Sequence, residues 1–289
     1  MKRGLLIYKK EDYKMNETYA TMLIEYGKAH ELHVELVLYE DLQYGVDQMG
    51  LWVCHKGERL DKIDFAINRS RESMLSRHLE WMGVRVFNRY EVTYLANHKG
   101  RTHQFISHLG IPSLKTSFFY PEFMTSDQIP LEYPFVIKAP EGHGGTEVFM
   151  VHNQEALQKV LKKYTYKEWM LQELCSHVGE DVRVFVIGGK IIGAIRRFSQ
   201  TDFRANYCLG GEIEWYDLSE EQKQRVEKIL EHLSCDYVGI DFMIDAKGKW
   251  IFNEIEDVVG SRSLYTLKKV DTAKLYIEHI AQCFVNKKV

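Results

Sequence analysis

Three acidic residues near the C-terminal end of the chain have a spacing that suits a divalent cation. Asp241 interrupts an apolar run, and Glu254 and Glu256 lie two residues apart on the next one. Because side chains alternate along a strand, the two glutamates project from one face. Magnesium prefers oxygen ligands and is often held by one or two carboxylates together with substrate phosphates. The solvated face of an edge strand explains the glutamates equally well, but an unpaired Asp241 among Ile240 and Phe242 would be costly to bury.

A lysine followed by glycines forms a second candidate site. Lys138 lies in the apolar run Phe135–Ala139, and Gly142, Gly144 and Gly145 follow it. Glycines let backbone N–H groups approach phosphate oxygens, and the ammonium group neutralises their charge. The alternative is a lysine that only extends to the surface. The P-loop pattern G-x-x-x-x-G-K-[ST] does not match here, which excludes a P-loop NTPase.

Two further groups of polar residues are ambiguous when taken alone. Arg204 and Asn206 lie in a polar stretch that reads equally well as an ordinary loop. Arg196 and Arg197 are either a fork that binds a substrate carboxylate or surface charge.

The elements that must position these residues begin with an α/β unit. Apolar runs predict strands, and helical spacing predicts the helices between them. The alternation ends at Asn88, where we place the first domain boundary. The expected elements are strand Gly4–Tyr8, helix Thr18–Ala29, strand Val34–Tyr39, strand Phe65–Asn68, helix Met74–Trp81 and strand Val84–Phe87.

The second part of the chain reads as hairpins with helices between them. A helix is expected over Tyr94–Leu109, and Ser219 opens another through a capping box with Gln222. The amphipathic segment Ala273–Phe284 either closes the core or pairs with another subunit, and we favour core closure. The expected hairpins join Phe135–Ala139 to Glu147–Val151, Val182–Ile187 to Ile191–Arg197, and Val238–Ile244 to Trp250–Ile255.

Composition limits the class of protein. The 289 residues include 38 Lys and Arg against 41 Asp and Glu, a net charge of −3 without a basic block, so a nucleic-acid partner is not expected. The five cysteines are scattered and lack a C-x-x-C pair, which argues against disulfides and a zinc site. No stretch approaches the ~20 apolar residues of a membrane span. We therefore expect a cytoplasmic protein.

Taken together and in order, these motifs resemble the ATP-grasp superfamily, and within it the RimK-like (ribosomal-protein glutamate ligase) branch of carboxylate-amine ligases. The resemblance runs from about Asp64 to Leu264. It is carried by Asn97-His98-Lys99, Val136-Ile137-Lys138, the Gly142–Thr146 loop, Gln172-Glu173-Leu174, Gly179-Glu180-Asp181-Val182-Arg183, Asp202-Phe203-Arg204-Ala205-Asn206, Gly239-Ile240-Asp241 and Asn253-Glu254-Ile255-Glu256.

The resemblance implies an ATP-grasp fold of the α/β class. A Rossmann-like pre-ATP-grasp domain would occupy residues 1–88 and the ATP-grasp domain residues 89–289. Within the latter, a small lid lobe would cover about 115–170 and a large lobe about 171–289. The two lobes would clamp ATP between antiparallel sheets.

The resemblance also assigns roles to residues. Lys99, Lys138 and the lid glycines Gly142, Gly144 and Gly145 would contact the phosphates, Glu173 and Leu174 the adenine, and Asp181 the ribose. Arg204 and Asn206 would hold the terminal phosphate and the metal, so Arg204 and Lys138 are the expected catalytic residues. Asp241, Glu254 and Glu256 would ligate one or two Mg²⁺ ions, for which Mn²⁺ is an alternative.

Three positions depart from the family pattern. Glu256 stands where the branch usually has asparagine, which adds a negative charge at the metal. Asp257-Val258-Val259-Gly260 replaces the usual stretch of small residues and proline, which puts the acceptor side in doubt. Glu147 replaces a glycine that is usual in the lid.

The expected activity is ATP-dependent joining of a carboxylate to an amine through an acylphosphate, with release of ADP and phosphate. The alternatives are a phosphotransferase built on the same fold and a non-catalytic nucleotide-binding protein. The sequence does not name the carboxylate or the amine, so amino acids, peptides and protein tails stay open. A homo-oligomer is also compatible with it.

Overall fold

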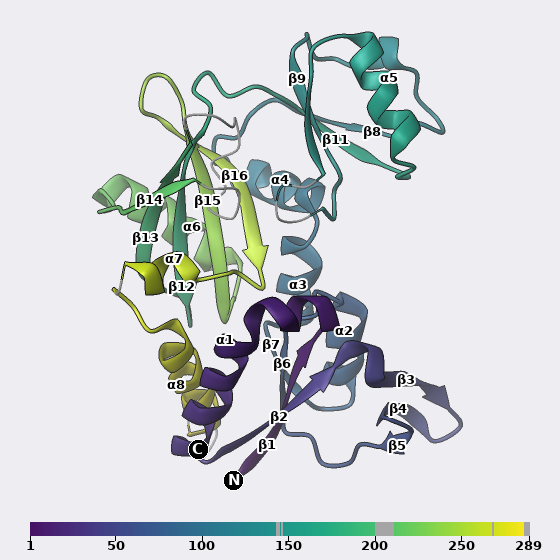
Figure 1. Ribbon diagram of the computed structural model, residues 1–289, viewed down its shortest axis with the longest axis vertical. Coiled ribbons are helices and arrows are strands. Elements are labelled where there is room, and N and C mark those ends of the chain that lie inside the picture. The colour runs from purple at the N-terminus through teal and green to yellow at the C-terminus, as the bar shows by residue number, and fades with distance from the viewer. Residues whose placement is uncertain (143–144, 146, 200–210, 268, 286–289) are drawn as a thin grey trace.

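A parallel sheet forms the N-terminal part of the computed structural model, which describes residues 1–142, 145, 147–199, 211–267 and 269–285. Its strand order is β2-β1-β6-β7 (Figure 1). A small antiparallel sheet, β3-β4-β5, extends from it. The elements are β1 (Lys2–Tyr8), α1 (Lys10–Ala29), β2 (Leu32–Leu38), η1 (Tyr39–Asp41), β3 (Leu42–Asp47), β4 (Gly50–His55), β5 (Glu58–Arg59), β6 (Phe65–Asn68), α2 (Ser73–Trp81) and β7 (Arg85–Phe87).

Two helices lead from this sheet to a lid. The lid is an antiparallel sheet of order β10-β9-β11-β8 with α5 packed on it, and Figure 1 shows it at the opposite end of the molecule from the N-terminal sheet. The elements are α3 (Tyr90–Ala96), α4 (Lys99–His108), β8 (Thr116–Phe119), η2 (Ser126–Gln128), β9 (Phe135–Lys138), β10 (Val148–Val151), α5 (Gln154–Lys163) and β11 (Trp169–Glu173).

A five-stranded antiparallel sheet of order β14-β13-β12-β15-β16 lies between these two parts. One of its faces packs on α3, α4 and α6, and the other packs on α1 and α8. The elements are β12 (Glu180–Ile187), β13 (Lys190–Phe198), β14 (Glu212–Trp215), α6 (Glu220–His232), β15 (Tyr237–Ile244), β16 (Trp250–Asp257), α7 (Arg262–Thr266) and α8 (Thr272–Val285).

The apolar core crosses the boundary placed at residue 88. Leu6 and Phe65 of the N-terminal sheet share one buried cluster with Phe185 of β12 and with Tyr276 and Ile277 of α8. The C-terminal helix therefore closes the core, as expected. The domain and lobe boundaries stay predictions, and the lid sheet runs to Glu173 rather than ending near 170.

One predicted helix is two helices in the structure. The expected helix Tyr94–Leu109 is interrupted at Asn97 and His98, because His98 has an extended backbone and its side chain caps α4 by accepting a hydrogen bond from the Arg101 N–H. The expected hairpins are present. The four cysteines within the described ranges are free thiols, and no helix in the same ranges is long and apolar enough to cross a membrane.

Candidate active site

Lys138 is the last residue of β9 and is buried against two amides. Its ammonium group donates to Gln172 Oε1 at 2.8 Å and to Asn253 Oδ1 at 3.3 Å. Only 9% of the residue is exposed, so it does not extend to the surface as the alternative reading required. Burial lowers its pKa to about 8; Glu254 opposes this fall and Lys99 adds to it. No carboxylate in the described part of the chain pairs with it, and an incoming anion would supply the missing charge.

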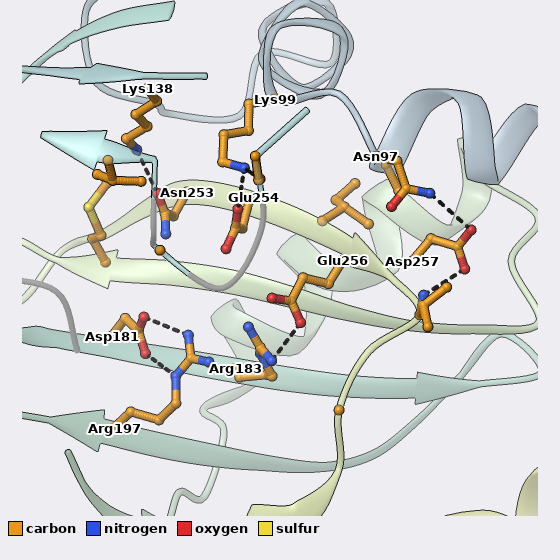
Figure 2. Close-up of a pocket in the computed structure, with 18 of the residues that line it drawn as sticks. Asn97, Lys99, Lys138, Asp181, Arg183, Arg197, Asn253, Glu254, Glu256 and Asp257 are labelled. Atoms are coloured by element: carbon orange, nitrogen blue, oxygen red, sulfur yellow. Dashed lines mark hydrogen bonds and ion pairs between the residues drawn. The ribbon is translucent and has the colours of Figure 1, made fainter. Parts of the chain in front are cut away.

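The break between α3 and α4 positions Lys99 at the first turn of α4. From there the ammonium group of Lys99 contacts the carbonyl oxygen of Gly142 in the lid loop and lies 3.7 Å from Glu254 Oε2. The lid loop, the helix start and β16 therefore meet at one point, as Figure 2 shows for Lys99 and Glu254.

The three predicted metal ligands converge. Asp241 lies opposite Glu254 in the β15–β16 ladder, and Glu256 lies opposite Gly239. One carboxylate oxygen from each of Asp241, Glu254 and Glu256 lies within 4.8 Å of the others. These are hard oxygen donors at a spacing that a Mg²⁺ ion can bridge, so the donor set fits the expected ion.

Two buried arginines already contact this cluster. Arg183 donates to both oxygens of Asp241 at 2.7 and 2.6 Å and lies 2.6 Å from Glu256. Arg197 donates to both oxygens of Asp181 and to Asp241 Oδ2. Burial alone would raise the pKa of Asp241, but the guanidinium groups of Arg183 and Arg197 outweigh it and hold that pKa below its usual range.

These contacts decide the ambiguity of Arg196 and Arg197. Arg197 is buried and paired with protein carboxylates, and Arg196 pairs with Glu180 and Glu214 near the surface. Both arginines are thus already paired with protein carboxylates, and binding of a substrate anion at either of them stays a prediction.

A cavity of about 450 Å³, within the range of small-molecule sites, is lined by Lys99, Lys138, Arg183, Arg197, Glu254 and Glu256. Glu173, Leu174 and Asp181 line it beside Lys138 and Gln172. The Glu173 carboxylate accepts a hydrogen bond from the Lys115 N–H at 2.8 Å, which fixes the end of β11.

The lid loop is described only in part. At Gly142 a Cβ atom would lie 3.1 Å from Glu147 Cβ and 3.3 Å from Ala139 Cβ, a tight fit that these neighbours would have to relieve by small shifts. Gly145 has φ +76°, a backbone conformation that favours glycine. The predicted residues Gly144, Arg204 and Asn206 lie outside the described residues, and their roles stay predictions.

A family model described as the RimK-like ATP-grasp domain matches residues 96–280, more than half of the chain. The chain belongs to the RimK-like ATP-grasp family. Two similar relatives have names that contain glutamate. The probable alpha-L-glutamate ligase of Cellvibrio japonicus is 26% identical over 267 residues, covering 88% of each chain. The beta-citrylglutamate synthase B of Mus musculus is 27% identical over 294 residues, covering 94% of this chain and 74% of the relative.

Solved structures confirm the ATP-grasp fold. The VanG D-Ala:D-Ser ligase from Enterococcus faecalis superposes with a TM-score of 0.76 at 17% identity, covering 98% of this chain and 99% of that one. The ATP-grasp ligase PsnB, solved with Mg and ADP, superposes with a TM-score of 0.68 at 17% identity, covering 96% and 98%. The expected family, fold and enzyme class, an ATP-dependent carboxylate-amine ligase, are thereby confirmed. ATP-grasp ligases use ATP with Mg²⁺ and join a carboxylate to an amine.

Sequence reasoning missed several polar residues that line this ATP-grasp cavity. Gln172 and Asn253 were noted as parts of motifs, yet their contact with Lys138 was not foreseen. Tyr8 and Arg69 also line the cavity. The available signal was their place at the carboxyl ends of β1 and β6, where α/β sheets bind ligands.

Proposed function

We propose that this enzyme binds ATP with its phosphates at Lys99 and Lys138, activates a substrate carboxylate, and passes the acyl group to the amine of an amino acid such as glutamate. The observation that supports this proposal is the convergence of two lysines and two glutamates, Glu254 and Glu256, on one cavity between the lid and the large sheet, with the buried Asp241 within reach of both glutamates.

The reaction has two steps. An oxygen of the substrate carboxylate attacks the γ-phosphorus, the bond from that phosphorus to the bridging oxygen breaks, and ADP leaves. The amine nitrogen then attacks the acyl carbon of the resulting acylphosphate, the carbon–oxygen bond to phosphate breaks, phosphate leaves and the nitrogen loses a proton. The products are an amide, ADP and phosphate.

The protein's own residues position these groups. The buried ammonium of Lys138, held by Gln172 and Asn253, has no rotational freedom to lose when a phosphate arrives, which favours precise in-line placement. Glu173 and Leu174 would contact the adenine and Asp181 the ribose. Asp241, Glu254 and Glu256 would hold one or two Mg²⁺ ions, which supply charge neutralisation on the phosphate oxygens; Mn²⁺ suits the same oxygen ligands.

Glutamate is the amine to test first. The names of both relatives contain glutamate, and the chain covers 88% and 74% of their lengths. A peptide or a protein tail that ends in an acidic residue would instead supply the carboxylate that is activated.

The experiment that tests the site compares wild type with Glu254→Gln in thermal melts with a non-hydrolysable ATP analogue, with and without Mg²⁺. A ligand at 100 times its Kd adds about 2.7 kcal/mol of stability, so binding gives a clear shift. We expect the wild-type shift to require Mg²⁺ and the variant to lose this requirement or the shift itself. Glu155→Gln, an exposed substitution on α5, is the matched control.

An identical Mg²⁺-dependent shift of the melting temperature in wild type and Glu254→Gln would contradict the assignment of Glu254 as a Mg²⁺ ligand. The wild-type protein is then incubated with glutamate and a panel of carboxylic acids. Release of both ADP and phosphate together with amide is expected, whereas ADP with a phosphorylated acceptor would indicate phosphotransfer instead.

A further inference from the structure

The cavity has a second end, built by the N-terminal sheet. Besides the lid and the large sheet, it is lined by Tyr8, Asp12, Asn16, Arg69 and Arg71. Tyr8 is the last residue of β1, Asp12 and Asn16 lie in α1, and Arg69 and Arg71 follow β6. None of them belongs to the motifs assigned to the nucleotide. This end of the cavity is therefore available to a substrate.

The topology of the sheet marks the same place. Tyr8 is the last residue of β1, and Arg69 directly follows β6, the parallel neighbour of β1. The helix after β1 packs on one face of the sheet and the helix after β6 on the other, as the separate clusters around Leu23 and Leu79 show. Such a switch point opens a crevice at the carboxyl ends of the strands, where ligands of α/β sheets bind.

Arg69 is a buried cation without a carboxylate partner. Only 5% of Arg69 is exposed. Its guanidinium lies 5.5 Å from the ring centroid of Tyr8 and 5.2 Å from the ring centroid of Tyr19. It donates one hydrogen bond, from Nη2 to the carbonyl oxygen of Val259 at 3.2 Å, and its Nε has no acceptor. No ion pair joins it to any carboxylate in the described ranges. The aromatic rings offset part of the cost of this burial, but not the lost hydrogen bonds.

Neighbouring arginines differ in this respect. Arg71, at the same end of the cavity, pairs with Asp12 at 2.7 Å, and Arg183 and Arg197 pair with the acidic cluster. Of these four arginines, Arg69 is thus the one that has no carboxylate within ion-pair distance in the described ranges. The planar guanidinium suits a carboxylate, which accepts two parallel hydrogen bonds from it.

The reacting carboxylate is assigned to another part of the cavity. That group must face the phosphates near Lys99, Lys138 and Glu254, whereas Arg69 contacts Val259, beyond the end of β16. We propose that Arg69 binds a second carboxylate, one that the reaction leaves intact. One of the two substrates therefore carries a carboxylate in addition to its reacting group. This inference rests on the proposed ligase function.

Calorimetric titration tests it with two pairs of probes, added to protein holding Mg²⁺ and a non-hydrolysable ATP analogue. L-glutamate and its α-amide, L-isoglutamine, represent the amine substrate. Glutarate and its monoamide represent the carboxylate substrate. We expect one pair to show at least tenfold tighter binding of the form with the additional carboxylate, and that pair identifies the substrate that carries it.

Substitution then assigns the preference to Arg69. In Arg69→Met we expect the preference to fall below twofold, and in Arg69→Lys to persist in part because a point charge remains. Arg77→Met is the matched control: Arg77 also stacks on an aromatic ring, 3.8 Å from the Tyr90 centroid, but it lies outside the cavity. A normal nucleotide-induced melting shift establishes that each variant is folded.

Two results would overturn the inference: a preference that survives Arg69→Met, or no preference in either pair although wild type binds the nucleotide. If wild type does not bind the nucleotide, the proposed function fails separately. The probe titrations are then repeated without nucleotide, and the same criteria decide on Arg69.

Discussion

At the scale of single residues, the site consists of charges whose partners come from distant parts of the sequence. Lys138 is held by amides 34 and 115 residues away, and Asp241 by arginines 58 and 44 residues away. Because of these contacts, the geometry of the sheets determines where each charged group lies, and the flexibility of its own side chain matters little. A substitution that removes one charge leaves its partners buried and unpaired.

Lys138→Met tests the role of the buried ammonium. The variant keeps the volume and removes the charge, so we expect at least tenfold weaker binding of the ATP analogue with Mg²⁺, measured by calorimetry on protein whose cooperative melting shows that it is folded. Lys159→Met, an exposed substitution on α5, should leave binding unchanged. Equal nucleotide affinity in wild type and Lys138→Met would exclude a phosphate contact.

The convergence of the three carboxylates could be predicted from the sequence, but their pairing with arginines and lysine could not. The alternation rule placed Glu254 and Glu256 on one face, and they do converge with Asp241. The contact of Arg183 with Asp241 depends on the register of β12 against β15. The position of Glu254 opposite Asp241 depends on the register of β15 against β16, and this register shifts after Asp241. Neither register can be derived from the spacing of residues within one strand. Arg69 was missed for a similar reason, since its tyrosine neighbours come from β1 and α1.

At the scale of secondary structure, segments with a clear local signal were predicted, and segments that depend on tertiary contacts were not. The hairpins of the large sheet and the capped helix α6 match expectation, because alternation and a capping box are local signals. The strands β8 and β11 and the helix α5 of the lid were missed. The break between α3 and α4 was missed as well, because the contact of Asn97 with Asp257 that accompanies it is tertiary.

Asn88, which follows β7, forms hydrogen bonds to β15 and β16, and its substitution should lower the stability of the fold. The side chain accepts hydrogen bonds from the N–H groups of Asp236 and Tyr237, and donates to the Tyr237 carbonyl and to Asp257. In Asn88→Ala several buried groups lose their partners, so we expect about 2–4 kcal/mol lower stability in urea unfolding.

Asn153→Ala provides the comparison for this prediction. Asn153 caps α5 at the surface by accepting a hydrogen bond from the Ala156 N–H, and loss of such a cap costs about 1 kcal/mol. Similar losses of stability in the two variants would show that the Asn88 contacts add nothing beyond a single ordinary hydrogen bond.

At the scale of the whole molecule, Asp236 connects three parts of the structure. Its carboxylate accepts two hydrogen bonds from Arg85 of β7, at 2.7 and 2.9 Å, and lies 2.8 Å from His279 Nε2 of α8. Burial alone would lower the pKa of His279, but its hydrogen bonds to Asp236 and Cys283 raise it to about 9. The protonated imidazole therefore helps to hold α8 on both the parallel and the antiparallel sheet.

His279 should make stability depend on pH. Its folded pKa of about 9 exceeds the unfolded value of about 6.5, so its contribution is complete below pH 6.5 and is lost as pH rises through 9. We expect His279→Gln to cost about 2 kcal/mol at pH 6 and much less at pH 9.5, measured by urea unfolding. The exposed His152→Gln should show no such trend. A pH-independent cost for His279→Gln would contradict the ion pair.

The arginine and lysine contacts of the acidic cluster affect the order in which Mg²⁺ and the nucleotide bind. Asp241 pairs with Arg183 and Arg197. Figure 2 shows Glu256 facing Arg183 and Glu254 facing Lys99. A bare divalent cation approaching this cluster meets carboxylates whose charge is already balanced, and it would have to compete with three fixed cations. A nucleotide that draws Lys99 to its phosphates frees Glu254 at the same moment. Magnesium should therefore enter with the nucleotide rather than ahead of it.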